Sequence, residues 1–399
     1  MRERIDFLFL NIGHFFDHLF MLLFATVAAL TLARQWGMGY AELIPYATPG
    51  FIAFGVCALP AGWIADKWSR KGMMIIFFFG TGAASIATSV AQTPLQISAG
   101  LAAIGVFAAI YHPVGLALVV HGREKTGMAL AINGVFGNIG VAGAALIAGY
   151  LIDASSWRWV FILPGLLSIA TGILYAGFLY WDRQSAATET RAAAIPAQAA
   201  PLDRRILIRV FAVIFISTGI GGLVFQSTTF SLPKIFDERL GDLAVSATMI
   251  GWYAFVVFTI AAFAQIVVGW LVDRHSIRLV FGFVAGLQMA FFAIMPNLTG
   301  MAALIVAIAF MLVVFGQIPI NDVLVGRMTR PVYRSRVFAL RYIVTFSVSA
   351  TAIPVIAWIH SGWGFYALFM VLSVAAAVIL AAVLTLPRTQ AVTGIAAAE

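Results

Sequence analysis

The sequence has few charged residues and long stretches that contain none. Asp, Glu, Lys and Arg make up 10% of the 399 residues, hydrophobic residues make up 62%, and the mean hydropathy is +1.00. Soluble domains contain about a quarter charged and about half apolar residues. A soluble core cannot bury this much apolar surface, so the composition excludes a soluble globular protein and predicts an integral membrane protein.

Cysteine is almost absent, and so are the motifs of common enzymes. Cys57 is the single cysteine and lies in an apolar run, which excludes an internal disulfide and a cysteine metal site. The chain also lacks a phosphate-binding Gly-Lys-Ser/Thr loop, a nucleophile elbow and a His-Glu-x-x-His motif. We therefore expect no enzymatic activity, no cofactor, no resident metal and no ATP-driven transport by this chain.

Apolar runs occupy most of the sequence, and each is long enough to cross a bilayer, which takes about 20 residues. Backbone amides find no water in hydrocarbon, so such runs must form helices. No removable signal is evident at the N-terminus, so the first run is expected to be a mature span. The predicted fold is an all-α integral membrane protein with twelve transmembrane helices in two six-helix bundles. The spans are about 6–33, 42–65, 73–91, 95–120, 127–152, 159–181, 206–232, 244–272, 279–296, 300–325, 337–359 and 363–386.

Two parts of the sequence resemble each other. The loop GWIADKWSRKG at 62–72 returns 207 positions later as GWLVDRHSIR at 269–278, and His112-Pro113 corresponds to Ile318-Pro319. Several correspondences at nearly one interval indicate a duplicated architecture. The predicted domains are a first bundle at 1–181, a polar cytoplasmic linker at 182–205, a second bundle at 206–387 and a cytoplasmic tail at 388–399.

Basic residues are distributed unequally between the two sides of the predicted helices. One side, with both termini, carries 19 Lys and Arg, whereas the other carries Arg34, Arg158, Lys234 and Arg239. Basic loops stay in the cytoplasm, so both termini are expected there, in a bacterial inner membrane. Basic loops beside an anionic leaflet also account for the net charge of +8, and no nucleic-acid partner is expected.

Taken together, the two halves and the repeated loop resemble the major facilitator superfamily over the whole chain. Within it, His14 and Asp17 in the first span, the run ending in Tyr111-His112-Pro113, and the glycines from Gly134 to Gly149 resemble the fosmidomycin-resistance-like exporters. The resemblance implies alternating access, a small-molecule substrate and a monomer. The chain departs from many antiporters of the family, since the fifth span continues without a Gly-Pro and the fourth span has no Arg.

The resemblance implies a conformational latch in the repeated loop. Its charges would pair with carboxylates, helix ends or lipid phosphates in one state of the transporter and separate in the other. A simpler alternative is that they are solvated residues that only set the topology. The latch residues are Gly62, Asp66, Lys67, Arg70, Lys71, Gly269, Asp273, Arg274 and Arg278.

Polar residues inside the first span indicate the coupling site. Asn11, His14, Asp17 and His18 fall on one stripe of a helix, and a carboxylate there costs roughly 2.5–3.5 kcal/mol of insertion free energy. Intramembrane ionisable residues are functional candidates by default, so Asp17, with His14 and His18, is predicted to take up and release a proton. A neutral polar network that packs the helix, or ligation of a divalent ion, would use the same residues.

The remaining polar residues within spans are candidates for binding the substrate. His112 stands before a proline and is alternatively a structural residue at a kink, and Asp322 could instead pair with Arg327 or Arg341. The predicted substrate-binding residues are Asn11, His112, Gln226, Gln317, Asn321, Asp322 and Arg341.

These observations predict a secondary active transporter that works by alternating access, with proton-coupled efflux of a small polar or amphipathic compound. Proton-coupled uptake of a small organic anion is the alternative, and transport of a divalent metal is less favoured. The expected partners are the substrate, protons and membrane lipids.

Overall fold

A computed structural model of the chain describes residues 2–121, 126–185, 204–328 and 331–386. Every regular element within these residues is helical, and eleven helical segments are long and apolar enough to cross a membrane. The last two predicted spans run together in one segment, Ser347–Leu384. Gly364 interrupts it with a φ of 66°, a backbone conformation that glycine tolerates because it has no Cβ.

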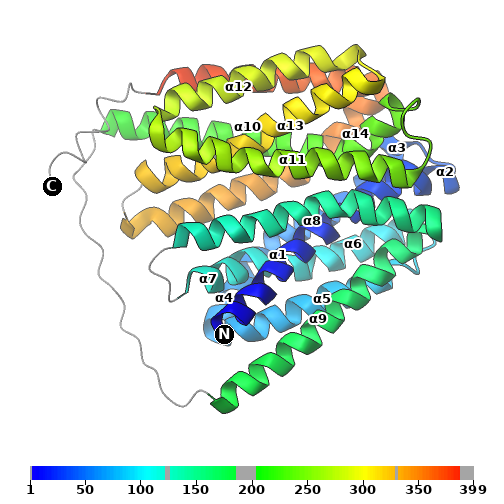
Figure 1. Cartoon of the computed structure of the whole chain (residues 1–399), viewed down its shortest axis with the longest axis vertical. Helices are drawn as coiled ribbons and strands as arrows, with labels where there is room; N and C mark the ends of the chain where they lie inside the picture. Colours follow the sequence, from blue (N-terminus) through cyan, green and yellow to red (C-terminus); the bar gives the residue numbers. More distant parts are fainter. Residues whose placement is uncertain (1, 122–125, 186–203, 329–330, 387–399) are drawn as a thin grey trace. The chain divides into compact units, whose positions relative to one another are not determined.

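The helices are bounded as follows, and Figure 1 shows them in chain order. They are α1 (Arg2–Val27), η1 (Ala28–Leu32), α2 (Ala33–Gln35), α3 (Tyr40–Leu43), η2 (Ile44–Ala47), α4 (Thr48–Lys67), α5 (Arg70–Thr88), α6 (Pro94–Ala108), η3 (Tyr111–Gly115), α7 (Leu116–Val120), α8 (Thr126–Ala154), α9 (Trp157–Ser185), α10 (Arg204–Arg239), α11 (Ala247–Arg274), α12 (Ile277–Ile294), η4 (Met295–Asn297), α13 (Gly300–Met328) and α14 (Pro331–Leu384).

Contacts divide the chain into two compact units. Unit 1 comprises Met1–Thr190, Thr229–Thr259 and Ile353–Trp358, and unit 2 comprises Arg191–Thr228, Ile260–Ala352 and Ile359–Glu399. The boundaries predicted from the repeat divide the chain differently and stay a prediction. Most of the predicted linker, residues 186–203, and the tail at 388–399 lie outside the described residues.

Unit 1 is built on close helix pairs. α1 lies along α8, α5 along α9, and α4 along α6 (Figure 1). Glycines permit these approaches: a Cβ at Gly140 of α8 would lie 2.2 Å from the backbone oxygen of Phe15, and one at Gly105 of α6 would lie 2.1 Å from that of Gly50. Lipid supplies no hydrophobic force between helices, so small residues at the interface allow the packing that holds them together.

Unit 2 has its own apolar core. Val213, Val272, Phe281, Ile320 and Val383 are almost fully buried and come from α10, α11, α12, α13 and α14. The same helices also bury polar side chains in this unit, among them Ser217 of α10, Gln288 of α12 and Gln317 of α13.

The fourth predicted span is interrupted where the sequence places His112 and Pro113. α6 ends at Ala108, and the chain then forms the π-helical turn η3 before α7 begins at Leu116. Proline has no amide hydrogen to donate and its ring crowds the preceding turn, which favours a local distortion of the helix. Pro319, at the corresponding position of the second half, lies within the α-helix α13 instead. The break predicted at this proline is confirmed, and it places Tyr111 and His112 toward α1.

Candidate functional site

The polar stripe of α1 lies in the interior of unit 1. Asn11, His14 and Asp17 are buried, Asp17 with 0% of its surface exposed, and His18 is half-buried. α8 and η3 cover this stripe, because α1 packs along α8 and the broken fourth span brings its turn against the same face.

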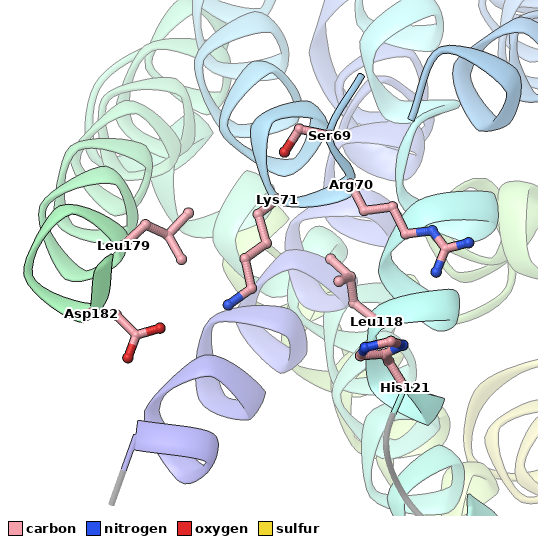
Figure 2. Close-up of a pocket in the computed structure, with 7 residues that line it drawn as sticks. All are labelled: Ser69, Arg70, Lys71, Leu118, His121, Leu179 and Asp182. Carbon is pink, nitrogen blue, oxygen red and sulfur yellow. The ribbon is translucent and has the colours of Figure 1, made fainter. Parts of the chain in front are cut away.

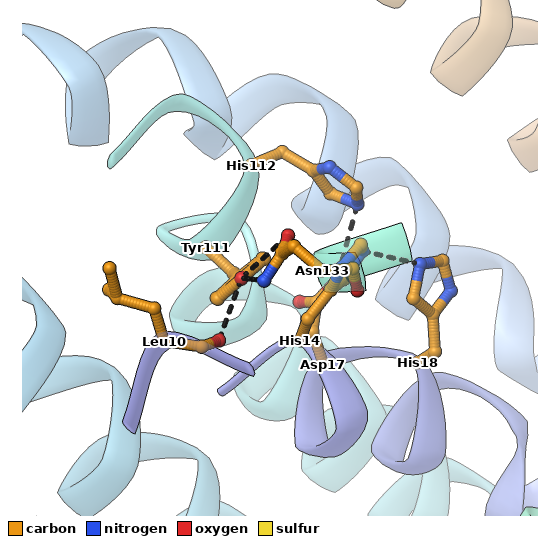
Figure 3. A network of polar contacts seen from close by, with 7 residues as sticks. All are labelled: Leu10, His14, Asp17, His18, Tyr111, His112 and Asn133. Carbon is orange, nitrogen blue, oxygen red and sulfur yellow. Dashed lines mark hydrogen bonds and ion pairs between the residues drawn. The ribbon is translucent and has the colours of Figure 1, made fainter. Parts of the chain in front are cut away.

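Three histidines and one carboxylate gather at this level (Figure 3). The Nε2 atoms of His14 and His18 are 3.2 Å apart, and Nε2 of His112 is 3.3 Å from a carboxylate oxygen of Asp17. The ring centroids of His14 and His18 lie 5.5 and 5.6 Å from that of His112. The predicted coupling residues and His112 therefore form one site, which we call the histidine cluster (His14, Asp17, His18 and His112).

Two further residues complete this site, Asn133 of α8 and Tyr111 of η3. The sequence marked Tyr111 only as part of the run Tyr111-His112-Pro113, and it did not single out Asn133. The side-chain nitrogen of Asn133 donates to Oδ1 of Asn11 and to the hydroxyl of Tyr111, each at 2.9 Å. The Tyr111 hydroxyl donates to the backbone oxygen of Leu10 at 2.8 Å. Asn133 is a polar residue inside an apolar, glycine-rich span, which is the signal that could have identified it.

The histidine cluster also has the composition of a transition-metal site. His14, His18 and His112 each offer one ligand atom, and these atoms lie within 4.8 Å of one another. Imidazole nitrogens suit zinc, copper, iron and nickel. The residues present would therefore fit such an ion.

Unit 2 contains a second polar network, made of neutral groups. The Gln317 side chain donates to the backbone oxygen of Ser217 at 3.3 Å and accepts from Gln288 at 3.0 Å, and the Ser217 hydroxyl donates to Asn321 at 2.9 Å. Gln317 and Asn321 are thus buried side by side, as the sequence predicts. Gln226 is also buried, and its amide nitrogen has no hydrogen-bond partner among the described residues. The side chains of Asp322 and Arg341 lie outside the described residues.

The two networks occupy equivalent places in the repeat. Pro113 and Pro319 are 206 residues apart, and the same interval relates Asn11 to Ser217 and Tyr111 to Gln317. In each unit, the residue from the fourth or tenth span donates to a backbone oxygen of the first or seventh span.

The titratable residues of the histidine cluster do not repeat. At the interval of 206, the positions of His14, Asp17, His18 and His112 correspond to Ile220, Leu223, Val224 and Ile318. The hydrogen bond from a neutral side chain to a backbone oxygen is therefore present in both halves. The titratable groups of the histidine cluster are present in the first half alone.

The repeated loop carries local ion pairs in its first copy. Asp66 accepts from Arg70, four residues along, at 2.8 Å, and Lys71 lies 3.7 Å from Asp6 of α1. Asp66, near the end of α4, thus pairs with the first residue of the next helix, α5. The role of the loop as a latch stays a prediction. Gly62 lets α4 pass the break in the fourth span, since a Cβ there would lie 3.2 Å from Pro113.

A cavity of about 350 Å³ opens beside this loop (Figure 2). Lys71 points toward its centre, while Asp182 and Leu179 of α9 line one side. Leu118 of α7 and His121, which follows α7, line the other. Positive and negative groups both line this cavity, so it has no single electrostatic character.

The second copy of the loop makes different contacts. Arg274 lies 4.2 Å from the ring centroid of Trp270, and Arg278 donates to the backbone oxygen of Leu386 at 3.1 Å. Lys67 and Asp273 lie at or near the C-terminal ends of α4 and α11, and a Cβ at Gly269 would meet open space. Both copies thus keep their positions at helix ends.

Comparison with known proteins identifies the architecture. The model of the Major Facilitator Superfamily matches residues 10–242 and 215–399. A solved bacterial homolog to the human lysosomal transporter Spinster, in an inward-facing and unoccupied conformation, has a TM-score of 0.71 at 12% identity and covers 98% of this chain and 96% of that one. The predicted fold class is confirmed.

Sequence relatives include transporters of different cargo. The gallate transporter of Pseudomonas putida is 24% identical over 281 residues, which are 62% of this chain and 61% of that protein. The puromycin resistance protein of Streptomyces alboniger is 31% identical over 136 residues, which are 33% of this chain and 27% of that protein. The chain therefore spans about six tenths of the first relative and about a quarter of the second. The fosmidomycin-resistance-like branch stays a prediction.

Proposed function

The chain belongs to the major facilitator superfamily and is a membrane transporter, not an enzyme, and we propose that it is a secondary active transporter that exports a small polar or amphipathic compound in exchange for protons. Transport proceeds by alternating access. The 19 Lys and Arg on one side against four on the other support an inner-membrane orientation with both termini in the cytoplasm.

The observation that carries the proposal is the Asp17–His112 pair. The Asp17 carboxylate has 0% exposure and lies 3.3 Å from the His112 imidazole. A carboxylate in the membrane interior raises the free energy of insertion, so ionisable residues there usually have a function. Asp17 takes up a proton when the site faces one side and releases it when the site faces the other, and His14, His18 and His112 relay the proton along the cluster. The absence of these groups from the repeat-related positions supports a specific role.

Cargo contacts are proposed for polar groups whose hydrogen-bonding capacity is not fully used. The buried amide nitrogen of Gln226 is such a donor, since an unmet donor costs about 1–3 kcal/mol of desolvation that a bound molecule would relieve. Gln317 and Asn321 are further candidates in unit 2. Asn11 and His112 are the candidates in unit 1. Asp322 and Arg341 remain candidates from the sequence alone.

Proteoliposomes with an imposed pH gradient test the coupling. Asp17→Asn keeps the size of the side chain but removes the proton-accepting carboxylate, so proton-driven flux should be lost while exchange of cargo for cargo persists. Asp242→Asn, at an exposed carboxylate, is the matched control and should transport like the natural protein. Normal proton-driven flux in Asp17→Asn would show that Asp17 does not couple transport.

Uptake of a small organic anion with protons is the second candidate. The match to the gallate transporter, which extends over 62% of the chain, favours it. Inside-out and right-side-out vesicles with aromatic acids and amphipathic cations as probes distinguish the two. Proton-driven accumulation confined to inside-out vesicles supports export, and accumulation confined to right-side-out vesicles supports uptake.

The same vesicles test divalent metal transport, which the three imidazoles of the histidine cluster would permit. Zinc or cobalt would be followed with an internal metal-sensitive dye. Metal flux that survives without a pH gradient and disappears in His18→Gln would replace the proton proposal with metal transport.

A further inference from the structure

We propose that Asn133 and Gly137 of α8 are positioning residues of the histidine cluster, which hold His14 in one tautomer and so give its hydrogen bond with His18 a direction. The proposal rests on the proton coupling proposed above and adds residues that are neither charged nor titratable. Three observations support it.

The first observation is that the two ring nitrogens of His14 face different partners. Nδ1 lies 2.7 Å from the backbone oxygen of Asn133, and Nε2 lies 3.2 Å from Nε2 of His18. A carbonyl oxygen only accepts, so Nδ1 of neutral His14 carries the hydrogen and Nε2 carries the lone pair. His18 must then donate to His14. The carbonyl of Asn133 thereby fixes where the cluster can accept a proton.

The second observation concerns the space that His14 occupies. A Cβ at Gly137, one helical turn after Asn133, would lie 2.7 Å from Nε2 of His14 and 2.8 Å from Cε1. The imidazole therefore rests where any other residue would place its side chain. The ring of Tyr111 is also stacked on His14, at a centroid distance of 4.8 Å and an interplanar angle of 18°.

The third observation is that the side chain of Asn133 ties this part of α8 in place. Its nitrogen has two hydrogens, and both are used, one toward Asn11 and one toward the Tyr111 hydroxyl, at 2.9 Å each. The amide can therefore not rotate without losing a buried hydrogen bond. Loss of this side chain should let the carbonyl move away from His14.

No fixed charge on α8 competes with this arrangement. The titratable groups around His14 are Asp17 and His18 on α1 and Tyr111 and His112 on η3, and the sole charged residue of α8, Asp153, is near its far end. The helices α5 and α9 also pack on α1, and their charges lie at or near their ends. These are Arg70, Lys71, Arg158, Asp182 and Arg183.

Nitrogen-15 spectra of the full-length protein labelled at histidine test the tautomer directly. The natural protein should show one histidine with a protonated Nδ1 and a bare Nε2, and this signal should disappear in His14→Gln. Gly137→Ala should move the signal, because its methyl group enters the space of the ring. Gly134→Ala is the matched control on the same helix, since a Cβ there has no neighbour within 4 Å.

Transport measurements separate positioning from folding. Asn133→Ala should reduce proton-driven flux about tenfold and displace its pH profile, while exchange of cargo for cargo continues. Ser168→Ala removes a buried tie between α9 and α5 and should leave the pH profile unchanged. If Asn133→Ala does not fold, Gly137→Ala carries the same test.

Two results would overturn the proposal. One is an unchanged histidine signal and pH profile in both Asn133→Ala and Gly137→Ala. The other is equal loss of exchange and of proton-driven flux, which indicates a purely structural role. Absence of proton-driven flux in the natural protein would refute the coupling alone, and the nitrogen spectra would still decide the tautomer.

Discussion

At the scale of single residues, His112 connects the carboxylate to the other imidazoles. It lies 3.3 Å from Asp17 and presents its ring nearly perpendicular to that of His14, at an interplanar angle of 89°. A titratable ring in this position can exchange a proton with the carboxylate on one side and with the imidazoles on the other. It lies in η3 directly before Pro113, where the regular helix is interrupted.

His112→Gln should therefore uncouple transport. Glutamine has a comparable length and can still bond to Asp17, but it does not titrate, so proton-driven flux should fall by about two orders of magnitude. Flux in proteoliposomes at several pH values measures this. His121→Gln, at the end of α7, is the matched control and should be neutral. Full coupling in His112→Gln would confine the proton path to α1.

Parts of this site could be predicted from the sequence, and other parts could not. Helical periodicity places Asn11, His14 and Asp17 on one stripe, because residues three apart share a face of a helix. The role of Asn133 depends on the level at which α8 crosses α1, which tertiary packing sets and no local pattern encodes.

At the scale of elements, the C-terminal end of α8 contacts the beginning of α11 within unit 1. A carboxylate oxygen of Asp153 accepts from the backbone nitrogen of Thr248 at 2.7 Å and from its hydroxyl at 2.6 Å. A negative charge at a helix N-terminus meets unpaired amides and the positive end of the helix dipole. Gly149 and Gly251 bring the two backbones close, since a Cβ at either would lie within 2.5 Å of a carbonyl oxygen across the contact.

Opening this contact should lower the stability of the protein. Asp153→Ala removes an acceptor from the first turn of α11 and should cost about 1 kcal/mol, as loss of a helix cap does. We expect a melting temperature a few degrees lower in detergent, measured by loss of native fluorescence. Asp242→Ala removes an exposed carboxylate and should not change the melting temperature. Equal melting temperatures of all three proteins would mean that the contact contributes no stability.

At the scale of the whole molecule, duplication separates what the two halves share from what distinguishes them. Both contain the loop with an Asp near a helix end, and both contain a polar side chain of the fourth or tenth span that donates to a carbonyl of the first or seventh. Only the first half has the histidine cluster. The apolar helices, the repeat and the break at Pro113 could be predicted because each leaves a local signal, whereas the joining of the last two predicted spans and the contact units depend on how the chain packs.

The shared loop should govern the rate of conformational change and not the affinity for cargo. The Asp66–Arg70 pair is exposed, so it contributes at most about 1 kcal/mol to stability. If the loop acts as a latch, Asp66→Asn and Asp273→Asn should each slow exchange of cargo across the membrane while cargo affinity stays constant. Exchange kinetics and equilibrium binding on the same preparations measure both quantities. Because the loops are related by duplication, the two variants should slow exchange to a similar degree, and a double variant should be slower than either. Unchanged exchange in all three variants would leave the loops as determinants of membrane topology, which was the alternative drawn from their basic residues.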